Sequence, residues 1–153
     1  MSTNPYLDYV NSVQQLFLEG RTLPYGNFAK PTPLHLPEDA PVALILSPHP
    51  DDECIIGGLP LRLMKEGGIR IINVAITLGS NPQRKQERLT ELSKACEWIG
   101  FDLELSGENG LDPIRPETPE KDPVHWNKCV NILSGIFSQY NPCLLYTSPS
   151  PRD

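Results

Sequence analysis

The sequence predicts an α/β fold in which a mainly parallel β-sheet lies between two layers of helices. Residues 42–46 and 69–76 are short, continuous apolar runs, as expected of parallel strands that are buried on both faces. Segments with apolar residues at helical spacing alternate with these runs, which is the order of right-handed βαβ units. The 153 residues are enough for one domain of ordinary size with a buried core.

The N-terminal part differs from the rest of the chain. Residues 5–19 place Tyr6, Tyr9, Val13, Leu16 and Phe17 at helical spacing, which predicts a short amphipathic helix ending at Gly20. Residues 20–41 are rich in proline, so we expect them to lie over the surface of the domain and not to form a folded unit of their own. We therefore assign residues 1–40 to an N-terminal helix and a proline-rich lead-in.

From residue 42 the predicted elements are strand, helix, strand, helix, strand, polar loop and helix, over residues 42–46, 55–66, 69–76, 82–99, 101–105, 106–123 and 124–140. Pro60 is unfavourable inside a helix, so the first of these helices should begin near Gly58, with the proline in its first turn. A loop as long as 106–123 is usually functional or mobile. These elements predict a Rossmann-like three-layer sandwich over residues 41–142.

The last residues follow another pattern. Residues 143–146 are apolar enough for one more strand, but residues 147–153 (TSPSPRD) are polar and rich in proline. A doubly wound domain is not expected to finish directly after a core strand. We therefore expect the sheet to be incomplete on its C-terminal side and residues 143–153 to be a non-native tail on a truncated gene, with a short isoform as the alternative.

Composition excludes several classes of function. The net charge of −6 provides no basic surface for nucleic acid. No apolar run reaches about 18 residues and the N-terminus lacks a signal-peptide pattern, so we expect a cytoplasmic protein without a membrane span. The four cysteines are widely spaced, which favours free thiols over disulfides or a zinc–cysteine site.

The chemistry-bearing motif is the segment SPHPDDE, residues 47–53, directly after the first strand. Open parallel sheets bind ligands beyond the carboxyl ends of their strands. Here His49 is followed by three carboxylates, whose mutual repulsion a divalent metal would neutralise. Histidine and aspartate are standard zinc ligands, and adjacent aspartates cannot easily point the same way, so Asp51 and Asp52 should divide the roles of base and ligand. The alternative is an acid-rich helix N-terminus with His49 as a solvated bystander.

The strand followed by P-H-P-D-D-E is similar to the signature of the PIG-L/LmbE family, whose members are zinc-dependent N-deacetylases of N-acetylglucosamine conjugates. The resemblance covers residues 42–105, through the segments Ile76-Thr77-Leu78-Gly79 and Arg88-x-x-Glu91-Leu92-x-x-Ala95. It implies that His49 and Asp52 bind Zn²⁺, that Asp51 is the general base and that Arg88 helps to hold the substrate. The implied partner is a small N-acetylated sugar conjugate.

The chain departs from the family at the third zinc ligand, which the family takes from a later histidine. No histidine follows His125, which precedes the expected last strand and to which we assign a surface or loop role. His35, in the lead-in, has no better claim. One alternative is therefore an inactive fragment with an incomplete metal site.

Another alternative is a metal-assisted phosphoesterase, which needs a second cluster of acids. Residues 117–122, in the long loop, form the only other dense acidic stretch. We expect Trp98 and Trp126 to be packing residues and not platforms for stacking a sugar.

Overall fold

A computed structural model of the protein describes residues 4–24, 26, 28–108 and 110–148. The chain divides into two compact units, residues 1–30 and 31–153. The first unit contains helix α1 (Pro5–Gly20), in which Asn4 caps the N-terminus by accepting a hydrogen bond from the Tyr6 N–H at 3.0 Å. No helix in the described part of the chain is long and apolar enough to cross a membrane.

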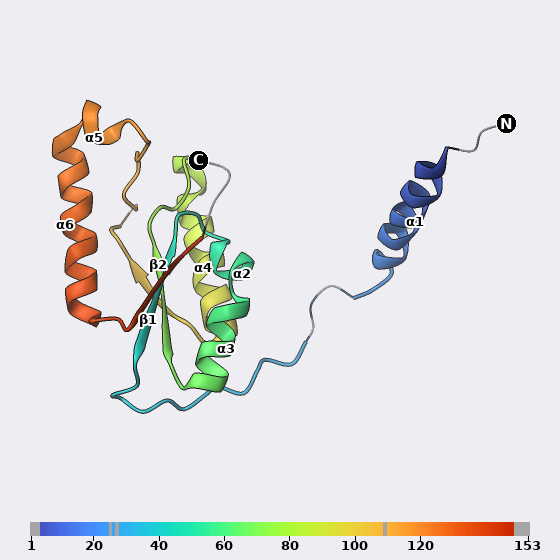
Figure 1. The fold of residues 1–153 in the computed structure, drawn as a ribbon, viewed down its shortest axis with the longest axis horizontal. Helices are drawn as coiled ribbons and strands as arrows, with labels where there is room; N and C mark the ends of the chain where they lie inside the picture. Colours follow the sequence, from blue (N-terminus) through green and yellow to red (C-terminus); the bar gives the residue numbers. More distant parts are fainter. Residues whose placement is uncertain (1–3, 25, 27, 109, 149–153) are drawn as a thin grey trace. The chain divides into compact units, whose positions relative to one another are not determined.

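The second unit is built on a four-stranded sheet (Figure 1). All its strand pairs are parallel, and the strand order is β3-β2-β1-β4. The strands are β1 (Val42–Ser47), β2 (Arg70–Ala75), β3 (Asp102–Leu105) and β4 (Leu144–Thr147). In the central pair Leu44 lies opposite Ile72, and on its other side it lies opposite Leu145. The predicted parallel sheet is confirmed.

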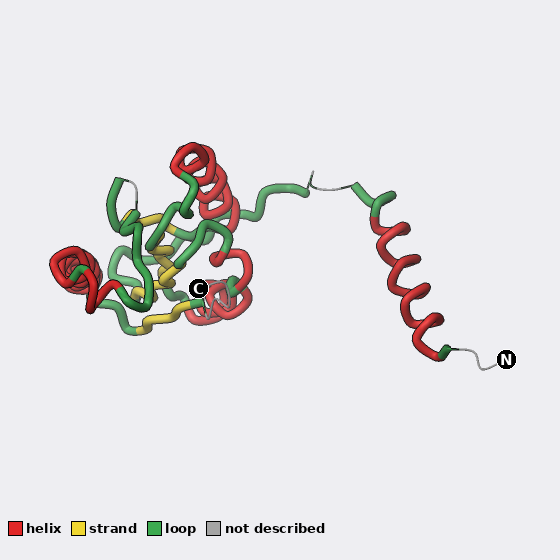
Figure 2. Tube along the Cα trace, turned by 90° about the horizontal axis from the view of Figure 1, so that it is seen from above, coloured by secondary structure: helices red, strands yellow, loops and turns green. Residues whose placement is uncertain are grey.

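Helices lie on both sides of this sheet, as Figure 2 shows from above. They are α2 (Asp52–Ile55), α3 (Gly58–Gly67), α4 (Lys85–Ile99), α5 (Thr118–Lys121) and α6 (Pro123–Tyr140), with a 3₁₀ turn, Pro82–Arg84, before α4. Alternate residues of β1 show how the layers meet. Ala43 and Ile45 belong to a buried cluster with residues of α3 and α4, and Leu44 belongs to a second cluster with Ile136 of α6.

The structure therefore has three layers: α3 and α4, the sheet, and α6. Leu36, in the proline-rich lead-in, packs against the cluster formed with α3 and α4. The four cysteines are free thiols, as expected. Cys96 and Cys129 are buried, and Cys54 and Cys143 are exposed.

Two segments predicted as loop contain short helices. α2 begins at Asp52, within the motif, and α5 lies within the long segment 106–123. Each is a single turn of four residues, which is too short to show helical periodicity in a sequence. α3 begins at Gly58 with Pro60 in its first turn, as predicted. The last apolar run, residues 143–146, does form an edge strand, β4.

Candidate functional site

The order of the strands places a crevice at the carboxyl end of β1. From β1 the chain builds β2 and β3 on one side, and β4 then pairs with the other side of β1. Such a reversal is the topological switch point at which open α/β sheets bind ligands. Pro48 and His49 leave β1 at this point, so the motif begins where the fold offers a site.

The motif is a tight turn held by its own hydrogen bonds. The backbone N–H groups of Asp51 and Asp52 both donate to the His49 carbonyl, at 3.1 and 3.3 Å. The His49 N–H donates to Asp52 Oδ2 at 2.7 Å. These bonds bring the two side chains together, with His49 Nδ1 at 3.5 Å from Asp52 Oδ2. The Asp52 side chain is 1% exposed and that of His49 is 21% exposed, so the carboxylate lies deeper than the imidazole.

The separation of these two atoms fits a shared zinc ion. Zinc binds histidine nitrogen and carboxylate oxygen at roughly 2.0–2.2 Å in tetrahedral geometry, so two such donors lie about 3.4 Å apart. The observed 3.5 Å matches this spacing and is long for a direct hydrogen bond. Nitrogen and oxygen donors together are also a set that zinc accepts.

The buried carboxyl of Glu53 also indicates that the acidic motif lacks a compensating positive charge among the described residues. Its side chain is buried, and within the part of the chain that the structure describes its Oε2 atom has no hydrogen-bond partner. Its Oε1 atom accepts a hydrogen bond from the Cys54 thiol at 3.3 Å. Burial raises the pKa of the Glu53 carboxyl, and the charges of Asp51 and Asp52 raise it further. A cation beside these acids would offset their repulsion.

A complete set of zinc ligands is not assembled. Among the described residues, no group of three histidine, cysteine, aspartate or glutamate side chains is placed to hold a metal ion. His49 Nδ1 and Asp52 Oδ2 are the two potential donor atoms that the motif brings together. Asp51 lies one residue before Asp52, at the start of the same helical turn, and its carbonyl accepts from the N–H groups of Cys54 and Ile55.

The segment after β2 is tied to the motif. Thr77 Oγ1 donates to the Pro48 carbonyl at 2.7 Å and accepts from the Gly79 N–H at 3.1 Å. Thr77 also bridges to Gly110, and the Leu111 N–H donates to the Ile76 carbonyl at 2.8 Å. The beginning of the long segment 106–123 is thus held against the carboxyl ends of the strands.

A cavity of about 570 Å³ lies between the motif and this segment. Its residues on the strand side include Pro48, His49 and Ile76, and those on the opposite side include Ile114 and Trp126. The volume falls within the roughly 300–1,000 Å³ of small-molecule sites. His49 therefore faces a cavity that is large enough for a ligand.

Arg88, the predicted substrate-binding residue, lies on α4 and reaches the wall of this cavity. Gly79 belongs to the cavity lining and has a φ of +84°. A Cβ atom at Gly79 would lie 2.8 Å from Arg88 Nη1, so the guanidinium group packs directly against this glycine. The structure thus places Arg88 beside the cavity.

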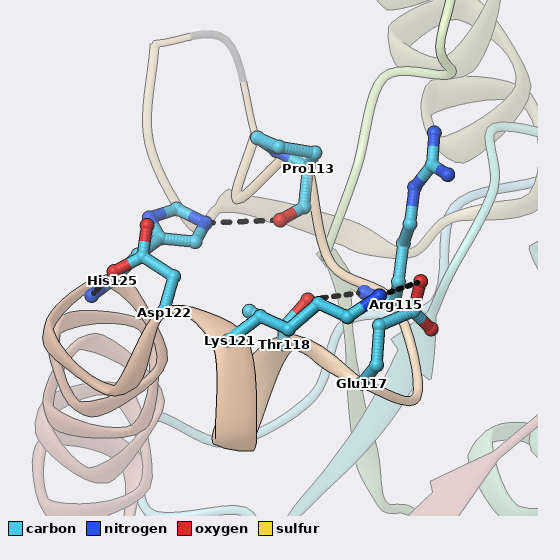
Figure 3. Close-up of a pocket in the computed structure, with 7 residues that line it drawn as sticks. All are labelled: Pro113, Arg115, Glu117, Thr118, Lys121, Asp122 and His125. Atoms are coloured by element: carbon cyan, nitrogen blue, oxygen red, sulfur yellow. Dashed lines mark hydrogen bonds and ion pairs between the residues drawn. The ribbon is translucent and has the colours of Figure 1, made fainter.

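His125 has a structural role in this fold. Its Nε2 atom lies 3.2 Å from the Leu111 carbonyl and 3.1 Å from the Pro113 carbonyl. Both partners are carbonyl acceptors, and the Cys129 thiol also lies 3.6 Å from Nε2, so this ring nitrogen is surrounded by groups of the fold. Figure 3 shows His125 turned toward Pro113, in a second cavity of about 380 Å³. His125 anchors the long segment to α6, and His35 lies exposed in the lead-in.

The cavity contains residues that the sequence did not indicate. Trp126, for which we expect a packing role, lines it, as does Ile114. Both come from segments far along the chain from His49, so no local spacing connects them to the motif. The unusual length of segment 106–123 was the only signal of their part in the site.

No family model and no curated protein matches the chain. Two crystal structures of a deacetylase from the biosynthesis pathway of teicoplanin, one with teicoplanin and one with bog, align with a TM-score of 0.53 at 16% identity. The alignments cover 71% of this chain and 58% and 55% of those chains. The 4-carboxy-2-hydroxymuconate hydratase GalB from Pseudomonas putida KT2440 aligns with a TM-score of 0.49 at 21% identity, over 69% of this chain and 45% of that chain.

The chain therefore spans a little over half the length of the deacetylase structures. A likeness at this level of identity shows a shared fold, the three-layer α/β sandwich with a parallel sheet. Activity has to be argued from the site.

Proposed function

We propose that the site performs zinc-dependent hydrolysis of the acetamide of an N-acetylglucosamine conjugate. His49 and Asp52 are the zinc ligands and Asp51 is the general base. The observation that carries this proposal is the 3.5 Å spacing of His49 Nδ1 and Asp52 Oδ2 at the switch point of the sheet. The motif's resemblance to the PIG-L/LmbE signature and the fold shared with a teicoplanin-pathway deacetylase support it.

The residues of the motif divide the work. His49 and Asp52 would hold a zinc ion, which would supply Lewis-acid polarisation of the acetamide carbonyl. Asp51 takes a proton from the attacking water as the new C–O bond forms, and the C–N bond breaks afterwards, when the nitrogen is protonated. The same proton then passes to the departing amine, so that acetate and the free amino sugar are the products. The hydrogen bond from the His49 N–H to Asp52 Oδ2 fixes the carboxylate throughout.

The two-donor site predicts slow turnover by the 153-residue chain, because a catalytic zinc normally has three protein ligands. Free imidazole can act as a third nitrogen donor. We therefore expect acetate release from an N-acetylglucosaminide to be very low with zinc alone and to rise when imidazole is added. Asp51→Asn should remove most of the rate, by about 10²–10⁴-fold, while zinc binding persists, because only the base is lost.

The assay has clear controls. His35→Ala removes an exposed histidine outside the site and should leave the imidazole-dependent rate unchanged. Acetate release that is independent of zinc, or that Asp51→Asn leaves at the wild-type rate, would contradict the proposal. Rapid turnover without imidazole would show that a third donor is already present.

A phosphoesterase with two metals is less well supported. Its second metal would need the acids of residues 117–122. Glu117 instead pairs with Lys121 at 3.8 Å, and Asp122 Oδ1 accepts from the His125 N–H at 3.0 Å. These contacts engage both acids in holding α5 and the start of α6.

A further inference from the structure

We propose that the cavity beside His49 accepts an apolar aglycone, an aromatic or alkyl group attached to the sugar, and that Trp126 is its platform. This inference rests on the proposed function, because it names the class of N-acetylglucosamine conjugate that the same site takes. The motif in the sequence bears only on hydrolysis of the acetamide, so the sequence does not indicate which aglycone the site accepts.

The wall opposite the motif is mainly apolar. The segment between β3 and α6 contributes Ile114, Pro116 and Pro119 to it, and α6 contributes Trp126. Ile76, directly after β2, also lines the cavity. Burial of an apolar group against these carbon surfaces favours binding in proportion to the area removed from water. A polyhydric aglycone such as a cyclitol would lose water and meet few polar partners on this wall apart from Asp112 and Arg115.

The cavity is preformed. The Arg115 N–H donates to Thr118 Oγ1 at 2.8 Å, which fixes the turn that carries Pro116 and Pro119. The His125 ring holds the Pro113 carbonyl, and Ser106 Oγ donates to the Ala75 carbonyl at 2.8 Å. Prolines restrict the backbone between these anchors. The entropic cost of ordering the wall when a ligand binds would therefore be small.

Two charged residues also contact the cavity, and neither dominates it. Asp112 lies 3.2 Å from Lys85, so its charge is balanced by a neighbour. Arg115 is exposed, and Figure 3 shows its side chain pointing away from Glu117 and Lys121. An anionic aglycone paired with Arg115 is the competing possibility. The exposure of Arg115 favours the apolar group, because a solvated ion pair contributes little.

The position of the cavity suits a group next to the reacting sugar. His49 and Pro48 line the same space as Trp126. An aglycone against Trp126 would therefore leave the sugar beside Pro48 and His49, at the start of the motif. Aromatic side chains are well suited to this role, since they bury large flat surfaces at low entropic cost.

The test uses the whole chain without zinc and three probes that lack an acetamide: methyl β-glucoside, phenyl β-glucoside and carboxymethyl β-glucoside, whose aglycone is anionic. Dissociation constants come from NMR titrations that also follow the two indole N–H signals, those of Trp98 and Trp126. We expect phenyl glucoside to bind about tenfold more tightly than methyl glucoside. We expect it to shift the Trp126 signal and leave that of Trp98, which lies exposed on α4, in place.

Variants separate a platform from a packing role. Trp126→Ala should bring the affinity for phenyl glucoside down to that for methyl glucoside, whereas Trp126→Phe should retain most of the preference. Trp98→Phe is the matched control and should change neither constant. If Trp126→Ala does not fold, the indole shifts of the wild-type chain still decide the question.

Each outcome has one meaning. Equal binding of phenyl and methyl glucoside, or a shift confined to Trp98, would overturn the inference. Tighter binding of carboxymethyl glucoside than of phenyl glucoside would overturn it in favour of an anion site at Arg115. Preferential binding of phenyl glucoside at Trp126 in a chain that never releases acetate would support the apolar cavity and count against the deacetylase.

Discussion

Gly79 is a residue at which the backbone and the surrounding space both exclude a side chain. Its φ of +84° lies in the left-handed region, which L-residues other than glycine rarely adopt. The place of a Cβ atom is already taken by Arg88, 2.8 Å away. One glycine thus lets α4 bring a guanidinium group against the wall of the candidate site.

We expect Gly79→Ala to lower the free energy of unfolding by about 1–2 kcal/mol, through the strained φ and the displaced arginine. Urea denaturation measures this change. Gly135→Ala is the matched control, because Gly135 lies inside α6 with open space around it. That substitution should stabilise the protein by about 0.5–1 kcal/mol, since alanine is the better helix former. Equal effects of the two substitutions would contradict the close packing at Gly79.

The motif residues could be predicted from the sequence because they are contiguous. His49, Asp51 and Asp52 lie within four positions of each other, directly after an apolar run that had to be a buried strand. The cavity could not be predicted in the same way. Trp126 and Ile114 meet His49 only because the segment after β3 folds back over the strand ends, and these long-range contacts leave no periodic pattern in the sequence.

At the scale of elements, the two edge strands differ in how they are held. β3 is followed by Ser106, whose hydroxyl bonds to the carbonyls of Ala75 and Ile76, and Glu104 accepts a hydrogen bond from Tyr140. β4 pairs with β1, but Leu144, Leu145 and Thr147 are exposed. Beyond it the Ser148 N–H donates to the Leu46 carbonyl at 3.4 Å, a long hydrogen bond.

We therefore expect backbone amides in β4 to exchange with solvent faster than those in β1 and β3. A strand that buries little apolar surface opens by local fraying, whereas central strands open only with the whole domain. Hydrogen exchange followed by mass spectrometry compares the three strands in one experiment. Protection of β4 equal to that of β1 would show that residues 144–147 belong to the most stable part of the fold.

The hydrogen bond from Tyr140 to Glu104 joins the end of α6 to β3, and it should make the stability of the protein depend on pH. This bond, together with burial, raises the pKa of Tyr140 to about 12, from its ordinary value of 10.0. Its contribution to stability is therefore complete below about pH 10 and is lost as the pH rises toward about 12, because the unfolded chain ionises first. Tyr140→Phe should cost about 1 kcal/mol at about pH 8, and the cost should shrink above about pH 10.

Urea denaturation of the wild-type chain and of Tyr140→Phe at several pH values measures this difference. Tyr9→Phe, on the exposed surface of α1, is the control and should show no such convergence. A stability difference that stays constant from neutral to strongly alkaline pH would mean that the bond contributes nothing in solution.

Most elements could be predicted because their patterns are long. α4 and α6 repeat apolar residues over 15 and 18 positions, and β1 and β2 are continuous apolar runs. The sequence does not predict α2 as a separate helix, because four residues show no helical period, although an acid-rich helix N-terminus is the alternative for this segment. In the structure its two acids, Asp52 and Glu53, are buried.

At the scale of the whole molecule, the strand order determines where chemistry can occur. The order in which strands are added to the sheet reverses at β1. The carboxyl end of β1 therefore opens into a crevice, and the motif lies there. The long segment between β3 and α6 adds the second wall of the cavity. This arrangement brings His49 Nδ1 to 3.5 Å from Asp52 Oδ2, and His125 anchors the segment through the carbonyls of Leu111 and Pro113.

Zinc binding by His49 and Asp52 together underlies the proposed function. Equilibrium dialysis of the whole chain against zinc tests it most directly, with His49→Ala, Asp52→Ala and His35→Ala measured beside the wild type. We predict that the wild-type chain binds a single zinc ion, less tightly than a three-ligand site does. We predict that His49→Ala and Asp52→Ala each weaken binding by about tenfold or more, and that His35→Ala has no effect. Wild-type affinity in both His49→Ala and Asp52→Ala would contradict the claim.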